Sequence, residues 1–238
     1  MSGADAACGC RLLDWDSQFF SRRIATLNVE PDATPDAEAI DAWCRQNVVD
    51  CLYYLAPASR PEPIAFAGQN GFRLLDIRLT LACRFAAPPP ASPAATALLR
   101  IARASHRNTR FFRDGNFPVE LCEKLYERWI ENSLADPEAF VCVADIAGQA
   151  VGYCTGQRCA DGTGQIGLLA VDAAQRRLGL GRQLVRRMLA WFREQQLTGA
   201  HVVTQGGCVG PQQLYQQCGF VTSAVELWYH KWFTAAGR

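Results

Sequence analysis

The segment Leu168–Val185 reads LLAVDAAQRRLGLGRQLV, and it decides the interpretation of this chain. It begins with an apolar run, as the end of a buried strand does, and continues into a polar turn. From Gly181 to Gln195 the apolar residues recur at helical spacing. They are Leu184, Val185, Met188, Leu189 and Phe192. The segment therefore predicts a strand, a glycine-containing turn and an amphipathic helix, a succession typical of α/β folds.

The turn carries Arg176, Gly179 and Gly181 in the pattern Arg-x-x-Gly-x-Gly. Glycine lets the backbone approach an anion closely because it has no side chain in the way. The start of the following helix adds unpaired N–H groups and the positive end of the helix dipole. The turn is therefore interpreted as a cradle for a pyrophosphate group, with an ordinary glycine-containing turn as the alternative.

Other phosphate-binding and hydrolytic motifs do not fit the sequence. A dinucleotide fingerprint needs a third glycine where this chain has Leu184. A P-loop needs a lysine directly after a glycine, and neither Lys124 nor Lys231 follows one. The sequence also lacks the nucleophile elbow Gly-x-Ser-x-Gly. The remaining pattern, Arg-x-x-Gly-x-Gly, resembles the loop that binds coenzyme A in the GCN5-related N-acetyltransferases.

A second motif follows further along the chain. Leu214–Phe220 reads LYQQCGF, and Val202–Thr204 before it is a short apolar strand. Together with the loop at Arg176, this order resembles the GCN5-related N-acetyltransferase (GNAT) superfamily. The resemblance implies an α/β GNAT fold whose central mixed sheet is splayed at the cofactor site. It also implies an N-acetyltransferase that takes acetyl-CoA as its acyl donor and transfers the acetyl group directly to an amine.

Composition excludes several classes of protein. The chain has 238 residues, of which 49% are hydrophobic and 20% charged, so it can bury a core. Its formal net charge of +1 gives no reason to expect a nucleic acid or an anionic membrane as partner. No apolar run approaches the roughly 18 residues of a membrane span. Met1–Cys10 lacks the features of a signal peptide, so a cytoplasmic protein is expected.

Cysteine usage points to free thiols rather than to a scaffold. The chain has 11 cysteines, an odd number, and no Cys-x-x-Cys pair. Only three histidines are present, and none stands at ligand spacing beside a close cysteine pair. We expect reduced, mostly buried cysteines and no bound metal.

The proline-rich stretch Ala86–Thr96, AAPPPASPAAT, is the one break in composition. Consecutive prolines favour an extended connector without internal hydrogen bonds. The predicted organisation is an N-terminal α/β region (1–85), a Pro/Ala-rich linker (86–97) and a GNAT acetyltransferase domain (98–238). The N-terminal region is expected to form a wall of the acceptor site.

The expected elements follow the same order on both sides of this linker: strand, helix, strand, helix, a Gly-Phe pair and a final strand. In the N-terminal region they are Phe19–Val29, Pro35–Val48, Cys51–Leu55, Pro63–Asn70 and Leu74–Phe85. In the C-terminal region they are Gln165–Val171, Gly181–Gln195, His201–Thr204, Pro211–Gln217 and Thr222–Phe233. Alternating apolar residues support the strand that ends the first series, namely Leu75, Ile77, Leu79 and Leu81. The first region is interpreted as a reduced half of a GNAT fold, with chance similarity of two α/β units as the alternative.

Further segments resemble the group of GNAT enzymes that acetylate dTDP-fucosamine. They are Leu13–Phe20, Arg110–Asp114, Leu125–Ser133, Ile166–Ala170 and Val203–Gly206. The resemblance implies an acceptor amine on a nucleotide-linked amino sugar. Another small amine or a protein N-terminus is the alternative within enzymes, and a coenzyme A-binding module without turnover is the alternative outside them. A homodimer is left open.

The resemblance also implies roles for individual residues. The expected cofactor contacts are Leu169, Ala170, Val171, Arg176, Arg177, Leu178, Gly179, Leu180, Gly181, Arg182 and Cys208. Cys208 stands where family members often carry an asparagine. Tyr215 is the expected general acid toward the departing thiolate, because a phenol is neutral at pH 7 and can donate a proton. Asp76, beyond the first Gly-Phe pair, is the expected base, with a solvated carboxylate as the alternative.

The segment Ser105–Phe117 combines arginines with phenylalanines. In the superfamily, the loop in this position usually covers the acceptor. Arginine binds phosphate through its planar fork, and a phenylalanine ring can stack on a base or a sugar. The expected substrate contacts are Arg107, Arg110, Phe111 and Arg113. The alternative is a solvated basic loop over a small aromatic cluster.

Overall fold

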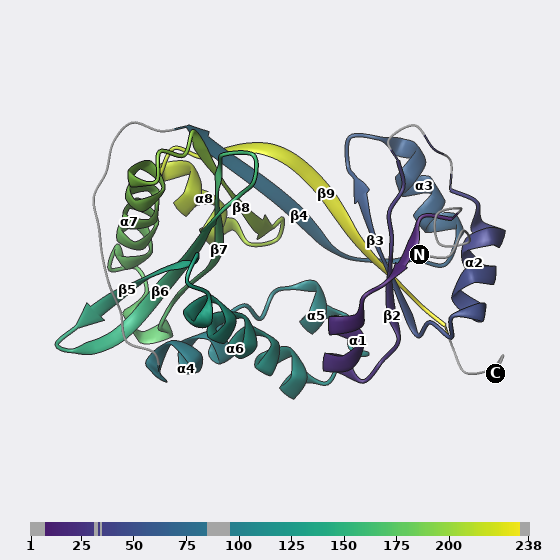
Figure 1. The fold of residues 1–238 in the computed structure, drawn as a ribbon, viewed down its shortest axis with the longest axis horizontal. Helices are drawn as coiled ribbons and strands as arrows, with labels where there is room; N and C mark the ends of the chain where they lie inside the picture. Colours follow the sequence, from purple (N-terminus) through teal and green to yellow (C-terminus); the bar gives the residue numbers. More distant parts are fainter. Residues whose placement is uncertain (1–7, 31–32, 34, 85–95, 234–238) are drawn as a thin grey trace. The chain divides into compact units, whose positions relative to one another are not determined.

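The computed structural model describes residues 8–30, 33, 35–84 and 96–233. The chain divides into two compact units (Figure 1). Unit 1 consists of residues 1–78, 113–117 and 225–238, and unit 2 consists of residues 79–112 and 118–224. The segment Leu168–Val185, which contains the end of a strand, a turn and the start of a helix, lies within unit 2.

Unit 2 is built on a mixed sheet with the strand order β9-β4-β8-β7-β6-β5. Its complete strands are β5 (Phe140–Ile146), β6 (Gln149–Arg158), β7 (Gly164–Val171) and β8 (Gly199–Gln205). Strands β5, β6 and β7 pair antiparallel, whereas β7 and β8 run parallel. The predicted α/β fold with a mixed sheet is confirmed.

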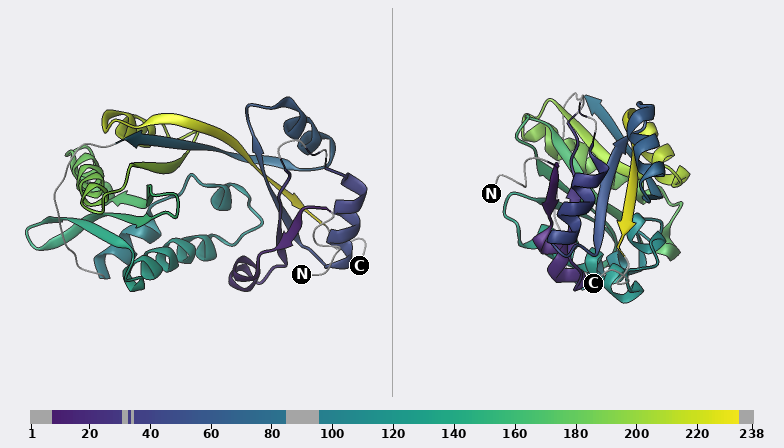
Figure 2. Two further views of the ribbon diagram at one scale, coloured as in Figure 1. Left: turned by 45° about the horizontal axis from the view of Figure 1, so that its top comes forward. Right: turned by 90° about the vertical axis from the view of Figure 1, so that its right-hand side faces the viewer.

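Helices cover both faces of this sheet. They are α4 (Thr96–Ala104), α6 (Val119–Ala135), α7 (Leu180–Glu194) and α8 (Val209–Gln217), with the short α5 (Arg110–Arg113) leading into the segment that belongs to unit 1. Helix α7 packs on one face of β5–β7, and α4 and α6 lie on the opposite face (Figures 1 and 2). This explains why β6 is buried from Ala150 through Gly156, since only a strand covered on both faces hides successive side chains.

Unit 1 has the strand order β1-β2-β3-β9-β4. Its elements are β1 (Cys10–Leu12), α1 (Asp14–Phe20), β2 (Ile24–Leu27), α2 (Ala37–Gln46), β3 (Cys51–Pro57) and α3 (Pro61–Gln69). Helix α2 begins where the Asp36 carboxylate accepts hydrogen bonds from the N–H groups of Glu38 and Ala39. Ile40, Trp43 and Cys44 form its buried face, and they pack in the core of this unit.

Two long strands, β4 (Arg73–Arg84) and β9 (Val221–Trp232), each end a repeated series of elements. The series β3-α3-β4 and β8-α8-β9 have the same lengths of 7, 9 and 12 residues. Each element of the second series begins 148 residues after its counterpart, as the starts Cys51 and Gly199 show. The repeat proposed from the sequence is therefore present in these elements, down to their spacing.

The helices of the two series also end in the same way. Gly71 and Gly219 both have a positive φ, of 75° and 92°. The phenylalanine after each glycine is buried, and its N–H bonds a carbonyl five residues earlier: Phe72 to Ala67, and Phe220 to Tyr215. The left-handed glycine closes the helix and turns the chain into the last strand.

The division into units differs from the one expected from composition. The last strand of the second series, β9, pairs antiparallel with β3 of the first series, from Cys51 opposite Trp232 to Pro57 opposite Glu226. Strand β4 in turn lies next to β8. In the sequence the division therefore falls within β4, after Arg78, and within β9, before Val225, rather than at the predicted linker, because pairing joins segments that are distant in sequence. Residues 86–95 of that linker lie outside the described residues, and α4 begins at Thr96.

The alternation predicted in β4 is only partly present. Leu75 and Leu81 are buried, but Ile77 is 38% exposed and Asp76 is only 3% exposed. A solvated carboxylate was the alternative expected for Asp76. In the structure Asp76 lies in the part of β4 that ends the sheet of unit 1, yet it is buried there and pairs with Arg113.

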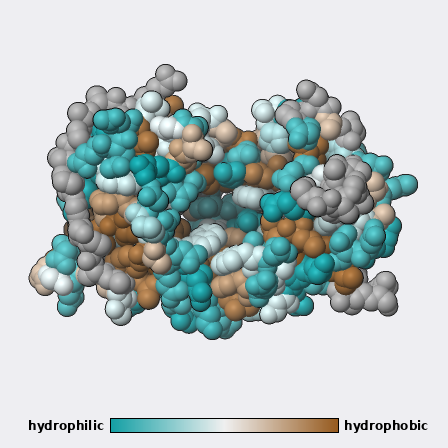
Figure 3. Space-filling model, in the orientation of Figure 1, coloured by the Kyte–Doolittle hydropathy of each residue, from teal (hydrophilic) through white to brown (hydrophobic). Residues whose placement is uncertain are grey.

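On the face drawn in Figure 3, hydrophilic residues are widespread and apolar residues gather in smaller patches. None of the helices within the described residues combines the length and the apolar character needed to cross a membrane. The cysteines whose side chains the structure describes, ten of the 11 in the chain, are free thiols.

Candidate active site

The sheet of unit 2 opens between β7 and β8. These parallel strands pair only at Gly164–Ile166 with Ala200–Val202, and no further pairing follows within their described residues. The second half of β7, from Gly167 to Val171, therefore presents a backbone edge without a strand partner on that side. Such an edge offers N–H and C=O groups to a ligand. The opening is the splay that the GNAT resemblance predicts.

The hydrogen bonds of β7 show which of its N–H groups face this opening. The N–H of Asp172 donates to the carbonyl of Val151 on the β6 side at 2.7 Å. Because backbone directions alternate along a strand, Ala170 also faces β6. Leu169 and Val171 consequently direct their N–H groups away from β6 and toward the opening. Their backbone, rather than their apolar side chains, is available there.

A bulge precedes these residues. Cys154 is opposite Leu169 and Gly156 is opposite Ile166, so Gly167 and Leu168 together face the single residue Thr155. The N–H of Leu168 donates to the Thr155 hydroxyl oxygen at 2.8 Å instead of to a backbone carbonyl. A bulge of this kind twists a strand and redirects the groups that follow it. Here those groups are the N–H donors of Leu169 and Val171.

The glycine loop leads from the end of β7 into α7. The Arg176 side chain donates from Nε to the carbonyl of Val171 at 3.1 Å, which fixes the end of the strand. Arg177 and Gly179 both adopt left-handed backbone conformations, with φ of 67° and 81°. Gly179 is the N-cap of α7, and a Cβ built on it meets no atom within 4 Å. No neighbouring atom would clash with a side chain at Gly179, so it is the left-handed backbone conformation that favours glycine there.

The first turn of α7 offers backbone groups that could bind an anion. Its opening N–H groups, from Leu180 to Arg182, have no partners within the helix and lie at the positive end of the helix dipole. Gly181 brings this end close to α8, because a Cβ at Gly181 would come within 3.2 Å of the Leu214 side chain. The two glycines therefore serve different purposes, one for backbone conformation and one for close helix packing.

These elements surround a pocket of about 860 Å³ within unit 2. It is lined by the segment after α4, the end of β7, the glycine loop and the first two turns of α8. Four arginines line it: Arg107, Arg176, Arg177 and Arg182. No carboxylate occurs among the described residues of this lining. The pocket thus suits an elongated anionic ligand. Every predicted cofactor contact except Leu178 lines it, and Leu178 is 60% exposed in the loop.

Tyr215 lies in α8 and lines the same pocket. Its ring packs edge-to-face with Phe220, at a centroid distance of 5.7 Å, in the core of unit 2. Burial raises the pKa of the Tyr215 phenol, so the hydroxyl stays protonated at neutral pH. A neutral, held phenol beside the pocket can donate a proton to a group bound there.

His106 also lines this pocket, and the sequence reasoning missed it. Its ring stacks on Tyr126 at a centroid distance of 4.7 Å, and Nε2 lies 3.5 Å from the Tyr153 hydroxyl. Burial, with a smaller effect of the Arg176 charge, lowers the pKa of His106 to about 4. His106 also has a φ of 60°, which costs energy for a residue other than glycine and is common at functional sites. Its only sequence signal was its place in the segment expected to cover the acceptor.

The family model "Acetyltransferase (GNAT) family" matches residues 99–220, more than half of the chain. The chain belongs to the GNAT acetyltransferase family. The matched range contains the splayed strand, the glycine loop and Tyr215, so the family prediction made from two motifs is confirmed. Acetyl-CoA is the acyl donor in this family.

Other GNAT proteins share the fold over most of the chain. A GCN5-related N-acetyltransferase from Sphaerobacter thermophilus superposes with a TM-score of 0.62 at 17% identity, covering 94% of this chain and 76% of that one. The GCN5-related N-acetyltransferase from Kribbella flavida has a TM-score of 0.56 at 16% identity, covering 90% and 83%. The likeness therefore extends beyond the matched family range and includes the elements of unit 1.

One curated relative is similar in sequence. The spore coat polysaccharide biosynthesis protein SpsD of Bacillus subtilis is 26% identical over 148 residues. The match covers 60% of this chain and 50% of SpsD. The chain thus spans about half the length of the curated relative that it matches.

The pocket fits the acyl donor of the family. Backbone N–H groups at the start of α7 and two arginines of the loop, Arg176 and Arg182, would hold a pyrophosphate. The free edge of β7 would pair with the extended pantetheine arm. Cys208 is the N-cap of α8 at the edge of the pocket, in the position where an asparagine is common in the family.

The predicted substrate residues are not gathered in one place. Arg107 lines the pocket and forms an ion pair with Glu123, and its guanidinium lies 5.2 Å from the centre of the Phe112 ring. Arg110 lies over the ring of Phe111, and Phe111 is buried in unit 2. Arg113 belongs to unit 1, where it pairs with Asp76 at 3.1 Å. Among these residues, Arg107 is the one that the structure places at the coenzyme pocket.

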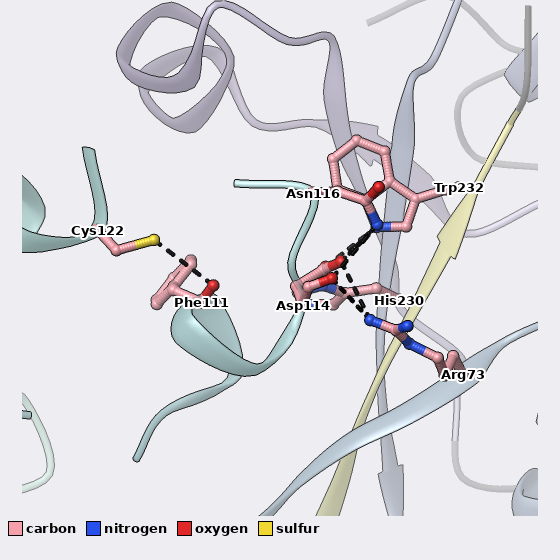
Figure 4. Close-up of polar contacts among 7 residues, drawn as sticks. All are labelled: Arg73, Phe111, Asp114, Asn116, Cys122, His230 and Trp232. Atoms are coloured by element: carbon pink, nitrogen blue, oxygen red, sulfur yellow. Dashed lines mark hydrogen bonds and ion pairs between the residues drawn. The ribbon is translucent and has the colours of Figure 1, made fainter. Parts of the chain in front are cut away.

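Asp114 is the centre of a buried polar cluster in unit 1 (Figure 4). Its carboxylate contacts Nδ1 of His230 and accepts hydrogen bonds from Trp232 Nε1 at 2.9 Å and Asn116 Nδ2 at 2.8 Å. Arg73 adds a charge-assisted hydrogen bond to the Asp114 carbonyl at 2.7 Å. Burial alone would raise the pKa of Asp114, but its hydrogen bonds, led by that from His230, leave it lowered. Asp114 is therefore a buried carboxylate with its partners in place.

Replacing Asp114 by alanine is expected to destabilise the protein by about 3–5 kcal/mol, because His230 would keep a buried polar ring without its partner. Urea unfolding measures the change. Glu138→Ala is the matched control, since the Glu138–Arg158 pair is exposed and is expected to contribute about 1 kcal/mol or less. Equal losses in the two variants would contradict the role given to Asp114.

Acidification is expected to destabilise the fold in part through His106. Its pKa of about 4 lies below the ordinary value of 6.5, so between these values the unfolded chain binds a proton that the folded chain excludes. The free energy of unfolding therefore falls as the pH drops from about 6.5 to about 4, by at most about 3 kcal/mol from this residue. His106→Gln should flatten this slope in urea unfolding at a series of pH values. His201→Gln is the control, and equal slopes in both variants would refute the assignment.

Proposed function

We propose that this protein transfers the acetyl group of acetyl-CoA to the amine of a nucleotide-linked amino sugar. The observation that carries the transfer is the combination of the free β7 edge, the glycine loop and Tyr215 around one pocket. The amino-sugar acceptor is supported by the similarity to a polysaccharide biosynthesis protein and by the segments that resemble the dTDP-fucosamine acetyltransferases.

The residues divide the work as follows. The N–H groups of Leu169 and Val171 point into the opening and donate to the oxygen of the thioester carbonyl, where negative charge develops. The neutral acceptor amine forms the new C–N bond as the C–S bond breaks. Tyr215 gives its proton to the departing sulfur, because its hydroxyl is protonated at neutral pH and lies at the pocket. The Arg176 and Arg182 side chains hold the anionic part of the donor.

The proton of the acceptor ammonium needs a second group. Asp76 is the base implied by the family resemblance, and its carboxylate accepts a hydrogen bond from Arg113 at 3.1 Å. His106 lines the pocket with Tyr215, and its neutral imidazole can accept a proton, although the lowered pKa makes it a weaker base than an ordinary histidine. Asp76 and His106 are therefore the two proposed candidates, and each acts directly or through water.

A binding panel and a thiol-release assay test this function. Acetyl-CoA should raise the melting temperature, because a ligand that binds only the folded state stabilises it. Free thiol should then appear with nucleotide-linked amino sugars and much more slowly with simple alkylamines or a peptide N-terminus. Binding of acetyl-CoA without turnover on any amine would show a coenzyme-binding module instead. Preferential turnover on a peptide would replace the sugar acceptor.

A further inference from the structure

A second hollow, of about 400 Å³, lies in unit 2 apart from the coenzyme pocket. It is formed by α6 on one side and by β6 and β7 on the other. Trp129 and Asn132 come from α6, Gln157 from β6 and Gln165 from the start of β7. These side chains take no part in the coenzyme pocket or in the proposed acetyl transfer.

The polar side chains that line this hollow are uncharged, and apolar surface lies between them. The lining contains three side-chain amides, two hydroxyl groups and one indole. No ionisable side chain occurs among the described residues that line it, in contrast to the four arginines of the coenzyme pocket. A phosphate or a carboxylate would find no cation here. A neutral ligand rich in hydroxyl groups would find both donors and acceptors.

Two of the amides form a hydrogen bond with each other, and both still have donors or acceptors that a ligand could use. Gln157 donates from Nε2 to Oε1 of Gln165 at 3.2 Å. That contact leaves the Gln157 oxygen as an acceptor and the Gln165 amide hydrogens as donors. Asn132 adds another amide from α6. Adjacent acceptors and donors of this kind match the neighbouring hydroxyl groups of a pyranose ring.

Trp129 supplies an apolar surface beside these amides. Its ring makes edge contacts with Tyr126, at 5.0 Å and 77°, and with Phe111, at 6.1 Å and 73°. These contacts fix the indole from its inner side, while the residue remains partly exposed toward the hollow. A held aromatic ring with amides around it suits a sugar, whose ring has an apolar face and polar edges.

The hollow borders the region where the acyl group would lie. Leu168 lines the hollow, and the next residue, Leu169, lines the coenzyme pocket. Successive side chains of a strand point to opposite faces, so β7 stands between the two spaces. A ligand in the hollow would therefore lie against the same strand, β7, whose free backbone edge would receive the thioester.

We propose that this hollow binds the sugar ring of the acceptor, a proposal that rests on the proposed function. The uncharged lining takes the hydroxyl-bearing ring and excludes the diphosphate of a nucleotide-linked sugar. It also offers no carboxylate to stabilise an ammonium group, which favours the acceptor amine in its neutral, nucleophilic form. Gln157, Gln165 and Trp129 determine the specificity for the ring.

Saturation-transfer NMR tests the hollow with D-galactosamine and with neutral D-galactose as probes, in the presence of coenzyme A. Gln157→Leu and Gln165→Leu remove amides while keeping most of the side-chain volume. Each is expected to weaken binding of both sugars about fivefold, the effect of losing a neutral hydrogen bond. Trp129→Phe, which keeps an aromatic ring, should reduce the transfer to the ring protons.

Gln149→Leu is the matched control, because Gln149 is an exposed residue at the opposite end of β6 from Gln157 and lines neither pocket. It should bind both sugars like the unmodified protein. Absence of sugar binding, or equal binding in all variants, would overturn the proposal. Failure of the proposed function is separate: it would appear as sugar binding in the hollow without thiol release from acetyl-CoA on any amine.

Discussion

Replacing Gly179 by valine is expected to abolish acetyl-CoA binding, with a loss in affinity of about 100-fold or more, or about 3 kcal/mol. Gly179 has a φ of 81°, which a β-branched residue adopts only with strain. The space around its missing Cβ is open, so a valine side chain would occupy room that the pyrophosphate needs for backbone contact. Isothermal titration calorimetry with acetyl-CoA measures the loss directly.

Gly148→Val separates the ligand effect from backbone strain. Gly148 lies in the turn between β5 and β6 with a φ of 79°, and its Cβ position is also open. The two variants should therefore lose similar stability in thermal unfolding, while Gly148→Val keeps the affinity for acetyl-CoA of the unmodified protein. Unchanged affinity in Gly179→Val, or an equal loss in both variants, would remove the glycine loop from the cofactor site.

Tyr215→Phe is expected to lower turnover by a factor of about 10² to 10⁴, or roughly 3–5 kcal/mol, with little change in acetyl-CoA affinity. The ring stays packed against Phe220, so the variant loses only the hydroxyl that protonates the thiolate. Affinity and turnover must be measured separately, because a combined ratio would hide which of them changed.

The control for this variant is Tyr54→Phe, which removes a hydroxyl from a tyrosine packed in the core of unit 1. It should leave turnover unchanged. If Tyr215→Phe lowers turnover less than about fivefold while chemistry limits the rate, Tyr215 is not the acid. Water or another donor would then protonate the leaving thiolate.

The sequence by itself determined the local elements of the site. Apolar spacing placed the helix at 181–195, and α7 spans Leu180–Glu194. The glycine pattern marked the loop because a left-handed φ and a close helix approach leave few residue choices at Gly179 and Gly181. The Gly-Phe pairs revealed the repeat, since each follows from the same local helix end. Such features depend on residues that are close together in the sequence. They can therefore be predicted from one sequence alone.

Only the tertiary structure decided which distant residues meet. Composition placed a boundary at the proline-rich segment, but the pairing of β9 with β3 assigns residues 225–238 to unit 1. Pairing over such a separation depends on the complementarity of whole strands, which no local pattern records. The same reason explains why His106 and the hollow at Trp129 escaped the sequence reasoning. A lowered histidine pKa and an uncharged sugar-sized hollow exist only where segments from α4, α6, β6 and β7 converge.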